Sequence, residues 1–115
     1  MSSPTARTLK LLRDQGFTAG VVERYNRFSK TRHDLGGCID IVAWKPGYGI
    51  VGVQACAGAS HAARVTKSRE QPGLRTWLES GGKFVVVSWA KQGARGKRKT
   101  WKDRWEWLTL ADVAA

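Results

Sequence analysis

The chain has few acidic residues and no long apolar stretch. Its 115 residues include nine Asp and Glu against twenty Lys and Arg, a formal net charge of +11. Apolar runs such as Phe84 to Val87 are short, whereas a membrane-spanning helix needs about 20 apolar residues. The N-terminal segment also lacks the apolar core of a secretion signal. We therefore expect no membrane partner and a cytoplasmic location.

Cysteine and histidine are equally scarce. The two cysteines, Cys38 and Cys56, show no CxxC spacing and cannot build a disulfide framework. Together with His33 and His61 they match no zinc-binding spacing. We expect both cysteines to be small buried side chains in a reducing compartment, and both histidines to be surface residues.

The composition is otherwise that of a folded domain. The apolar fraction is 42% and the charged fraction 25%, as in ordinary globular proteins, and the length suits one domain over residues 1–115. The excess of basic residues predicts a polyanionic partner, and nucleic acid is the commonest one.

Hydrophobic periodicity and turn residues predict an α/β fold. The expected elements are a helix over 5–15 that is capped by Ser2, Ser3 or Thr5, a strand over 17–25, a loop over 26–37, a hairpin of strands 38–44 and 50–56, helices over 61–70 (capped by Ser60) and 72–80, and strands over 83–89 and 104–110. A hairpin followed by a helical crossover implies a mixed central sheet flanked by helices. Trp77, Trp89, Trp105 and Trp107 are expected in the core.

Two polar residues interrupt the apolar runs of the hairpin. Asp40 lies between Ile39 and Ile41, and Gln54 interrupts the partner strand. A buried carboxylate is costly unless it is paired or bound to a metal, and adjacent strands can bring these two side chains together on one face. The alternatives are a structural acid at Asp40 and a satisfied core amide at Gln54.

Further charged residues can join this corner of the sheet. Glu23 is a third candidate ligand, although it can also pair with Arg24, Arg27 or Arg32 on the surface. Asp34 is expected to cap the turn before the strand. Carboxylate and amide oxygens suit Mg²⁺ or Mn²⁺, so Asp40, Glu23 and Gln54 are predicted metal ligands. Lys67, which shares a helix face with Arg64, is predicted to assist an attacking water.

Basic residues gather in three segments that we expect to bind phosphates. Residues 91–102 form a predicted flexible loop, in which Trp101 can stack on an unpaired base; a solvated charged loop is the alternative. The predicted DNA-binding residues are Lys30, Arg32, Arg64, Arg95, Lys97, Arg98, Lys99, Trp101 and Lys102.

The segment GCIDIVA (37–43), followed by a turn and GVQAC (52–56), resembles the PD-(D/E)XK nuclease superfamily, and most closely its small phage-type Holliday junction resolvase-like proteins. The stretches VVERYN, RHDLGGCIDIVA, ARVTK, WLESGGKFVVVSW and RWEWLTL extend this resemblance over most of the chain. It implies a restriction-endonuclease-like αβββαβ core and Mg²⁺-dependent cleavage of branched DNA. It also implies a homodimer in the cytoplasm of a bacterium or a phage-infected cell.

Under this resemblance Asp40 matches the first metal-binding acid of the motif. Gln54 stands at the position of the second acid and Cys56 at that of the lysine, with the lysine's role moved to Lys67 and the missing charge supplied by Glu23. These departures leave a second hypothesis, a catalytically inactive DNA-binding module that retains the fold. An RNA-binding or nucleoid-type basic protein is a third reading, which the interior acid and amide disfavour.

Overall fold

A computed structural model describes residues 3–113, and for Arg32 it describes the backbone alone. Its elements are α1 (Pro4–Asp14), β1 (Thr18–Val21), β2 (Arg24–Asn26), β3 (Thr31–His33), β4 (Ile41–Lys45), β5 (Gly49–Ala57), the 3₁₀ turn η1 (Gly58–Ser60), α2 (His61–Arg69), α3 (Pro72–Glu79), β6 (Lys83–Gln92), β7 (Thr100–Leu108) and the 3₁₀ turn η2 (Leu110–Asp112). Among these described residues, no helix has the length and apolar character needed to cross a membrane.

The central sheet is mixed, as predicted. Its five strands lie in the order β1-β4-β5-β6-β7, and only β5 and β6 run parallel. Parallel neighbours require a crossover connection, which α2 and α3 provide here. The α/β class, the β4–β5 hairpin and the crossover are therefore confirmed.

Helices cover both faces of the sheet because its strands alternate apolar side chains between the two sides. On one face Leu9, Leu12 and Phe17 pack against a cluster that includes Val53 and Val85. On the other, α2 and α3 contribute residues such as Val65 and Leu74 to a second buried cluster. The two cysteines belong to this second side and are buried, as predicted.

The first helix begins and ends almost where the sequence predicts. Of the three candidate caps, Ser3 is the N-cap residue, and its hydroxyl accepts a hydrogen bond from the Ala6 amide at 3.1 Å. Gly16 follows the helix with φ of +93°, a conformation that glycine adopts without strain. Ser60 is the N-cap residue of α2, as predicted, but its side chain makes no capping hydrogen bond.

Residues 26–37 were expected to form a loop, but they contribute to a second, two-stranded sheet. β2 and β3 pair antiparallel, with Arg24 opposite His33. The expected strand over 17–25 accordingly divides into β1 and β2. The division falls at Val22 and Glu23, whose amides both donate to the carbonyl oxygen of Asp40, at 2.8 and 3.3 Å.

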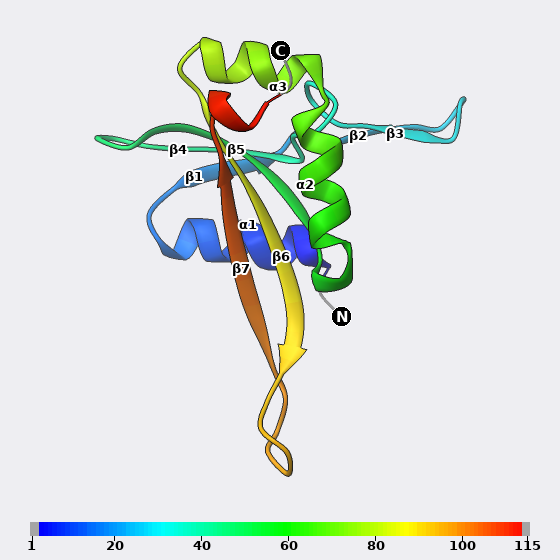
Figure 1. The fold of residues 1–115 in the computed structure, drawn as a ribbon, viewed down its shortest axis with the longest axis vertical. Coiled ribbons are helices and arrows are strands. Elements are labelled where there is room, and N and C mark those ends of the chain that lie inside the picture. Colours follow the sequence, from blue (N-terminus) through cyan, green and yellow to red (C-terminus); the bar gives the residue numbers. More distant parts are fainter. Residues whose placement is uncertain (1–2, 114–115) are drawn as a thin grey trace.

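The predicted basic loop over 91–102 is also largely a hairpin. β6 continues to Gln92 and β7 begins at Thr100, so Trp101 and Lys102 are strand residues and only 93–99 form the turn. The hairpin extends well beyond the body of the domain (Figure 1). The ends of its strands are exposed and carry mainly charged residues, so the sequence pattern resembled a loop.

Two further expectations about burial are wrong. Trp107 is 42% exposed because it lies on β7, which is an edge strand of the sheet. His61 was expected at the surface but is 2% exposed. Its ring lies 2.6 Å from the Ser88 hydroxyl through Nδ1 and 2.9 Å from a Glu106 carboxylate oxygen through Nε2. These polar partners on β6 and β7 explain why an imidazole is tolerated in the interior.

We predict that Gly73→Ala destabilises the fold. A Cβ at this position would lie 2.6 Å from the Cα and 2.8 Å from the carbonyl carbon of Gly36, and backbone atoms cannot move aside cheaply. We expect a loss of about 1–3 kcal/mol in the free energy of unfolding, measured by urea denaturation. Gly20→Ala is the matched control, because no atom lies within 4 Å of its added Cβ. A variant at Gly73 as stable as that control would contradict the close approach of α3 to residue 36.

Candidate functional site

Three carboxylates meet at one edge of the sheet. Glu23, Asp34 and Asp40 each place a carboxylate oxygen within 4.8 Å of the other two, and we call these three residues the acidic cluster. They come from three connections: Glu23 lies between β1 and β2, Asp34 follows β3, and Asp40 precedes β4. The predicted meeting of Glu23 with Asp40 is confirmed.

Asp40 is the buried member, with 4% of its surface exposed. Its Oδ2 accepts one hydrogen bond from Gln54 Nε2 at 2.7 Å and another from the Ala55 amide at 3.0 Å. The predicted contact between Asp40 and Gln54 is therefore confirmed. It arises because β4 and β5 pair antiparallel with Ile41 opposite Val53, so that Asp40 lies opposite Gln54. Gln54 uses its amide nitrogen here and so supports the Asp40 carboxylate. A role for Gln54 as a metal ligand stays a prediction.

Burial and the acidic neighbours dominate the electrostatics of Asp40. Burial raises the pKa of Asp40 to about 8, assisted by a hydrogen bond with the Asp34 carboxyl and by the negative charges of Asp34 and Glu23. The Ala55 amide acts in the opposite direction. Burial, followed by the charges of Asp34 and Asp40, similarly raises the pKa of the Cys38 thiol to about 12. A divalent cation bound by these oxygens would offset their negative charges, and hard oxygen donors are the type that Mg²⁺ and Mn²⁺ prefer.

Asp34 belongs to the cluster, although capping of a turn was the role favoured for it from the sequence. Its carboxyl hydrogen-bonds that of Asp40. Glu23 and Asp34 lie at the two ends of a polar segment, and pairing of its two halves brings these ends together. This spacing is the sequence signal that could have predicted their meeting.

The predicted lysine does not reach the cluster. Lys67 is exposed on α2, and within the described part of the chain its ammonium group makes no hydrogen bond or ion pair. Arg64, one turn earlier and partly buried, is the cation whose charge acts on Cys56. Cys56 itself is buried, and burial raises the pKa of its thiol. It therefore cannot replace the positive charge of a lysine.

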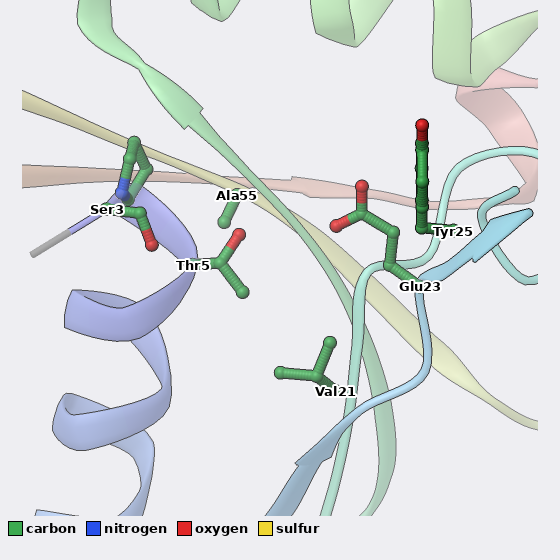
Figure 2. A pocket seen from close by; sticks show the side chains of 7 residues that line it. Ser3, Thr5, Val21, Glu23, Tyr25 and Ala55 are labelled. Carbon is green, nitrogen blue, oxygen red and sulfur yellow. The ribbon is translucent and has the colours of Figure 1, made fainter. Parts of the chain in front are cut away.

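A pocket of about 500 Å³ opens beside the cluster, lined by Ser3, Pro4, Thr5, Val21, Glu23, Tyr25 and Ala55. Figure 2 shows the Glu23 carboxylate pointing into it, with Tyr25 beside Glu23 and the first turn of α1 on the opposite side. The start of a helix carries partial positive charge, so this pocket combines that charge on one wall with a carboxylate on the other.

The predicted DNA-binding residues lie on three elements. Lys30 is in the β2–β3 turn, and the side chain of Arg32 lies outside the described residues. Arg64 is on α2. The β6–β7 hairpin carries five of the predicted residues, all exposed: Arg95, Lys97, Arg98, Lys99 and Lys102. Trp101 is 42% exposed, and the Arg7 guanidinium stacks 3.5 Å from its ring centroid. Its binding to a base stays a prediction.

Comparison of the chain with protein-family models, with curated proteins and with solved structures gives no match.

The raised pKa of Asp40 predicts a specific pH dependence of stability in metal-free protein. Between about pH 4 and pH 8 the folded state retains a proton that the unfolded state has released. Stability should therefore fall as pH rises through this window, by up to about 1.4 kcal/mol per pH unit from this one group. Urea denaturation in EDTA at several pH values measures the slope.

Asp40→Asn removes the titrating group and should flatten this part of the profile. Glu79→Gln makes the same change of acid to amide on the exposed face of α3 and should leave the slope as in the wild type. An unchanged slope in Asp40→Asn would show that the Asp40 carboxyl is not the source of the pH dependence.

Proposed function

We propose that this chain is a metal-dependent DNA endonuclease of the PD-(D/E)XK type, acting on branched or Holliday-junction DNA. The observation that carries the proposal is the position of buried Asp40 beside Glu23 and Asp34 in a chain of net charge +11. A basic protein that gathers three of its nine acids at one point needs a reason for doing so, and a bound divalent cation supplies one.

The order of elements supports this assignment. α1, the antiparallel strands β1, β4 and β5, the crossover helix α2 and the parallel strand β6 follow the αβββαβ sequence of a restriction-endonuclease-like core. Asp40 lies at the start of β4, and Gln54 lies opposite it on β5. These are the positions that the resemblance implies for the first acid and for the replaced second acid.

Each residue of the acidic cluster has a proposed role in metal binding. Asp40 and Glu23 would hold Mg²⁺ or Mn²⁺, and Asp34 joins them on geometric grounds. Such an ion, when bound, neutralises charge on a phosphodiester and lowers the pKa of a bound water. Gln54 and the Ala55 amide fix the Asp40 carboxylate through their hydrogen bonds. Arg64 is the partly buried α2 cation that would stabilise the phosphate, and Lys67 would have to move toward the cluster to stabilise the attacking water.

The charges outside the cluster support a nucleic-acid substrate. Basic residues outnumber acidic ones in the β2–β3 turn, in α2 and in the β6–β7 hairpin. These three segments could therefore bind phosphates on both sides of the cleavage point. A four-way junction presents two symmetric strands, so a C₂ homodimer is proposed with this substrate.

Three observations favour a second candidate, a DNA-binding module without activity. Gln54 brings no charge, Cys56 is buried at the lysine position, and Lys67 makes no contact with the cluster within residues 3–113. Both candidates predict binding to DNA that weakens steeply with salt. They differ in whether the cluster cuts the strand.

Cleavage of labelled DNA separates them. We expect the wild type to nick a four-way junction with Mg²⁺ or Mn²⁺ and not in EDTA, and to prefer it over linear duplex and single strand. Asp40→Asn should reduce the rate by roughly 100-fold or more, as loss of a direct transition-state stabiliser does, and should preserve DNA binding.

Glu79→Gln serves again as the matched control and should cleave like the wild type. If no substrate is cut with either metal although DNA is bound, the nuclease proposal is wrong and the binding module is the function. If Asp40→Asn cuts as well as the wild type, the activity does not come from this cluster.

A further inference from the structure

The β2–β3 hairpin, residues 24–33, contributes only its basic residues to the proposed function, and we call it the arm. Its two strands form a sheet of their own, separate from the central sheet. It extends away from the domain on the side of α2, opposite the β4–β5 hairpin (Figure 1). It therefore contributes little to the core, and its residues are not explained by packing.

The arm exposes two aromatic side chains. Phe28 is 90% exposed and Tyr25 is 60% exposed. With Arg24, Asn26, Arg27 and His33 they line a shallow pocket on the arm. A phenylalanine this exposed gains nothing from hydrophobic burial in the folded chain, and its ring is free to contact a partner.

Charge identifies the partner as a polyanion. The arm contains Arg24, Arg27, Lys30 and Arg32 and no acidic residue. The Arg27 guanidinium lies 5.6 Å from the centroid of the Phe28 ring, so the aromatic face and a phosphate-binding cation are presented together. A protein surface rich in acids would satisfy the cations, whereas a nucleic acid satisfies both the cations and the ring.

The arm holds Phe28 in place through its turn. The Asn26 Oδ1 accepts hydrogen bonds from the amides of Phe28 at 2.9 Å and Ser29 at 3.3 Å. The hydroxyls of Ser29 and Thr31 lie 2.6 Å apart and hydrogen-bond across the end of the turn. A side chain presented by such a turn loses less conformational entropy on binding than one on an open loop.

The arm also begins and ends at the acidic cluster. Glu23 immediately precedes β2 and Asp34 immediately follows β3, and both are cluster members. Five residues of extended chain span at most about 17 Å, so Phe28 lies within roughly five base steps of the cluster. A strand bound at the cluster would therefore have its neighbouring bases within reach of the arm.

We propose that the arm binds a DNA base that is unstacked from its neighbours, with Phe28 as the stacking residue, within about five base steps of the phosphodiester held at the acidic cluster. The proposal rests on the proposed function for the identity of the bound strand. A fully paired duplex offers no free base face and would gain only phosphate contacts from the arm. An extrahelical base also offers its ring surface, and aromatic side chains that stack on or wedge between bases bind such sites.

The test measures binding in EDTA, where metal-dependent cleavage cannot occur. Fluorescence anisotropy compares a duplex carrying one bulged 2-aminopurine with the fully paired duplex of the same sequence. We expect Phe28→Ala to weaken binding of the bulged duplex by roughly 5- to 150-fold, and to leave the paired duplex within about twofold. The 2-aminopurine emission should be quenched by the wild type and much less by the variant.

Two further variants complete the design. Phe28→Tyr keeps an aromatic ring and should retain the preference for the bulged duplex. Trp44→Ala removes an exposed aromatic ring, 48% exposed, from the β4–β5 hairpin and should behave like the wild type. Circular dichroism and thermal unfolding should show Phe28→Ala folded as the wild type, since the ring is exposed.

Equal binding of the bulged duplex by Phe28→Ala and the wild type would overturn the proposal. An equal loss on both duplexes would also overturn it, as would a loss of self-association in Phe28→Ala with unchanged DNA preference, which would make the arm a protein interface. None of these results depends on cleavage. A wild type that fails to cut DNA contradicts the proposed function alone, and a failed Phe28 test leaves the cleavage experiment unaffected.

Discussion

The hydrogen bonds that converge on Asp40 fix the part of the structure where function is proposed. Its amide donates to the Val53 carbonyl at 2.8 Å, and its carbonyl accepts from the amides of Val22 and Glu23. Its carboxylate accepts from Gln54 and Ala55. One residue thereby joins the chain after β1, the start of β4 and the middle of β5. The backbone of Asp40 hydrogen-bonds to the neighbouring chain segments, while its carboxylate forms part of the acidic cluster.

This arrangement places an electrostatic cost at the same point. The pKa of Asp40, raised to about 8 chiefly by burial, means that the metal-free cluster retains a proton where an ordinary carboxyl would have lost it. The rest of the chain has the opposite imbalance, with cations on the β2–β3 and β6–β7 hairpins. A cation at the centre and a polyanion around it would relieve both imbalances, which links the two halves of the proposed function.

Much of the fold could be predicted because local patterns decide it. α1 was readable from its leucine spacing and from Gly16, and the β4–β5 hairpin from two apolar runs joined by a Pro- and Gly-containing turn. The pairing of Asp40 with Gln54 followed from that hairpin. The remaining features depend on distant partners. His61 is buried beside two polar partners, Ser88 and Glu106, which lie 27 and 45 residues away in sequence. Trp107 is exposed on β7, which is an edge strand of the sheet. Neither position can be read from the neighbouring sequence. The described side chains of β2 and β3 are all exposed, so these strands lack the alternation of buried and exposed residues by which strands are recognised.

Because β2 and β3 pair antiparallel, the length of the arm can vary independently of the position of the carboxylates at its base. Arg24 pairs with His33, so Glu23 and Asp34 are brought together at the first rung of the hairpin whatever lies beyond it. Residues added or removed in matched pairs nearer the turn would lengthen or shorten the arm and leave that rung in register. The distance at which Phe28 is presented can thus change, in evolution or by design, while the carboxylates stay where they are.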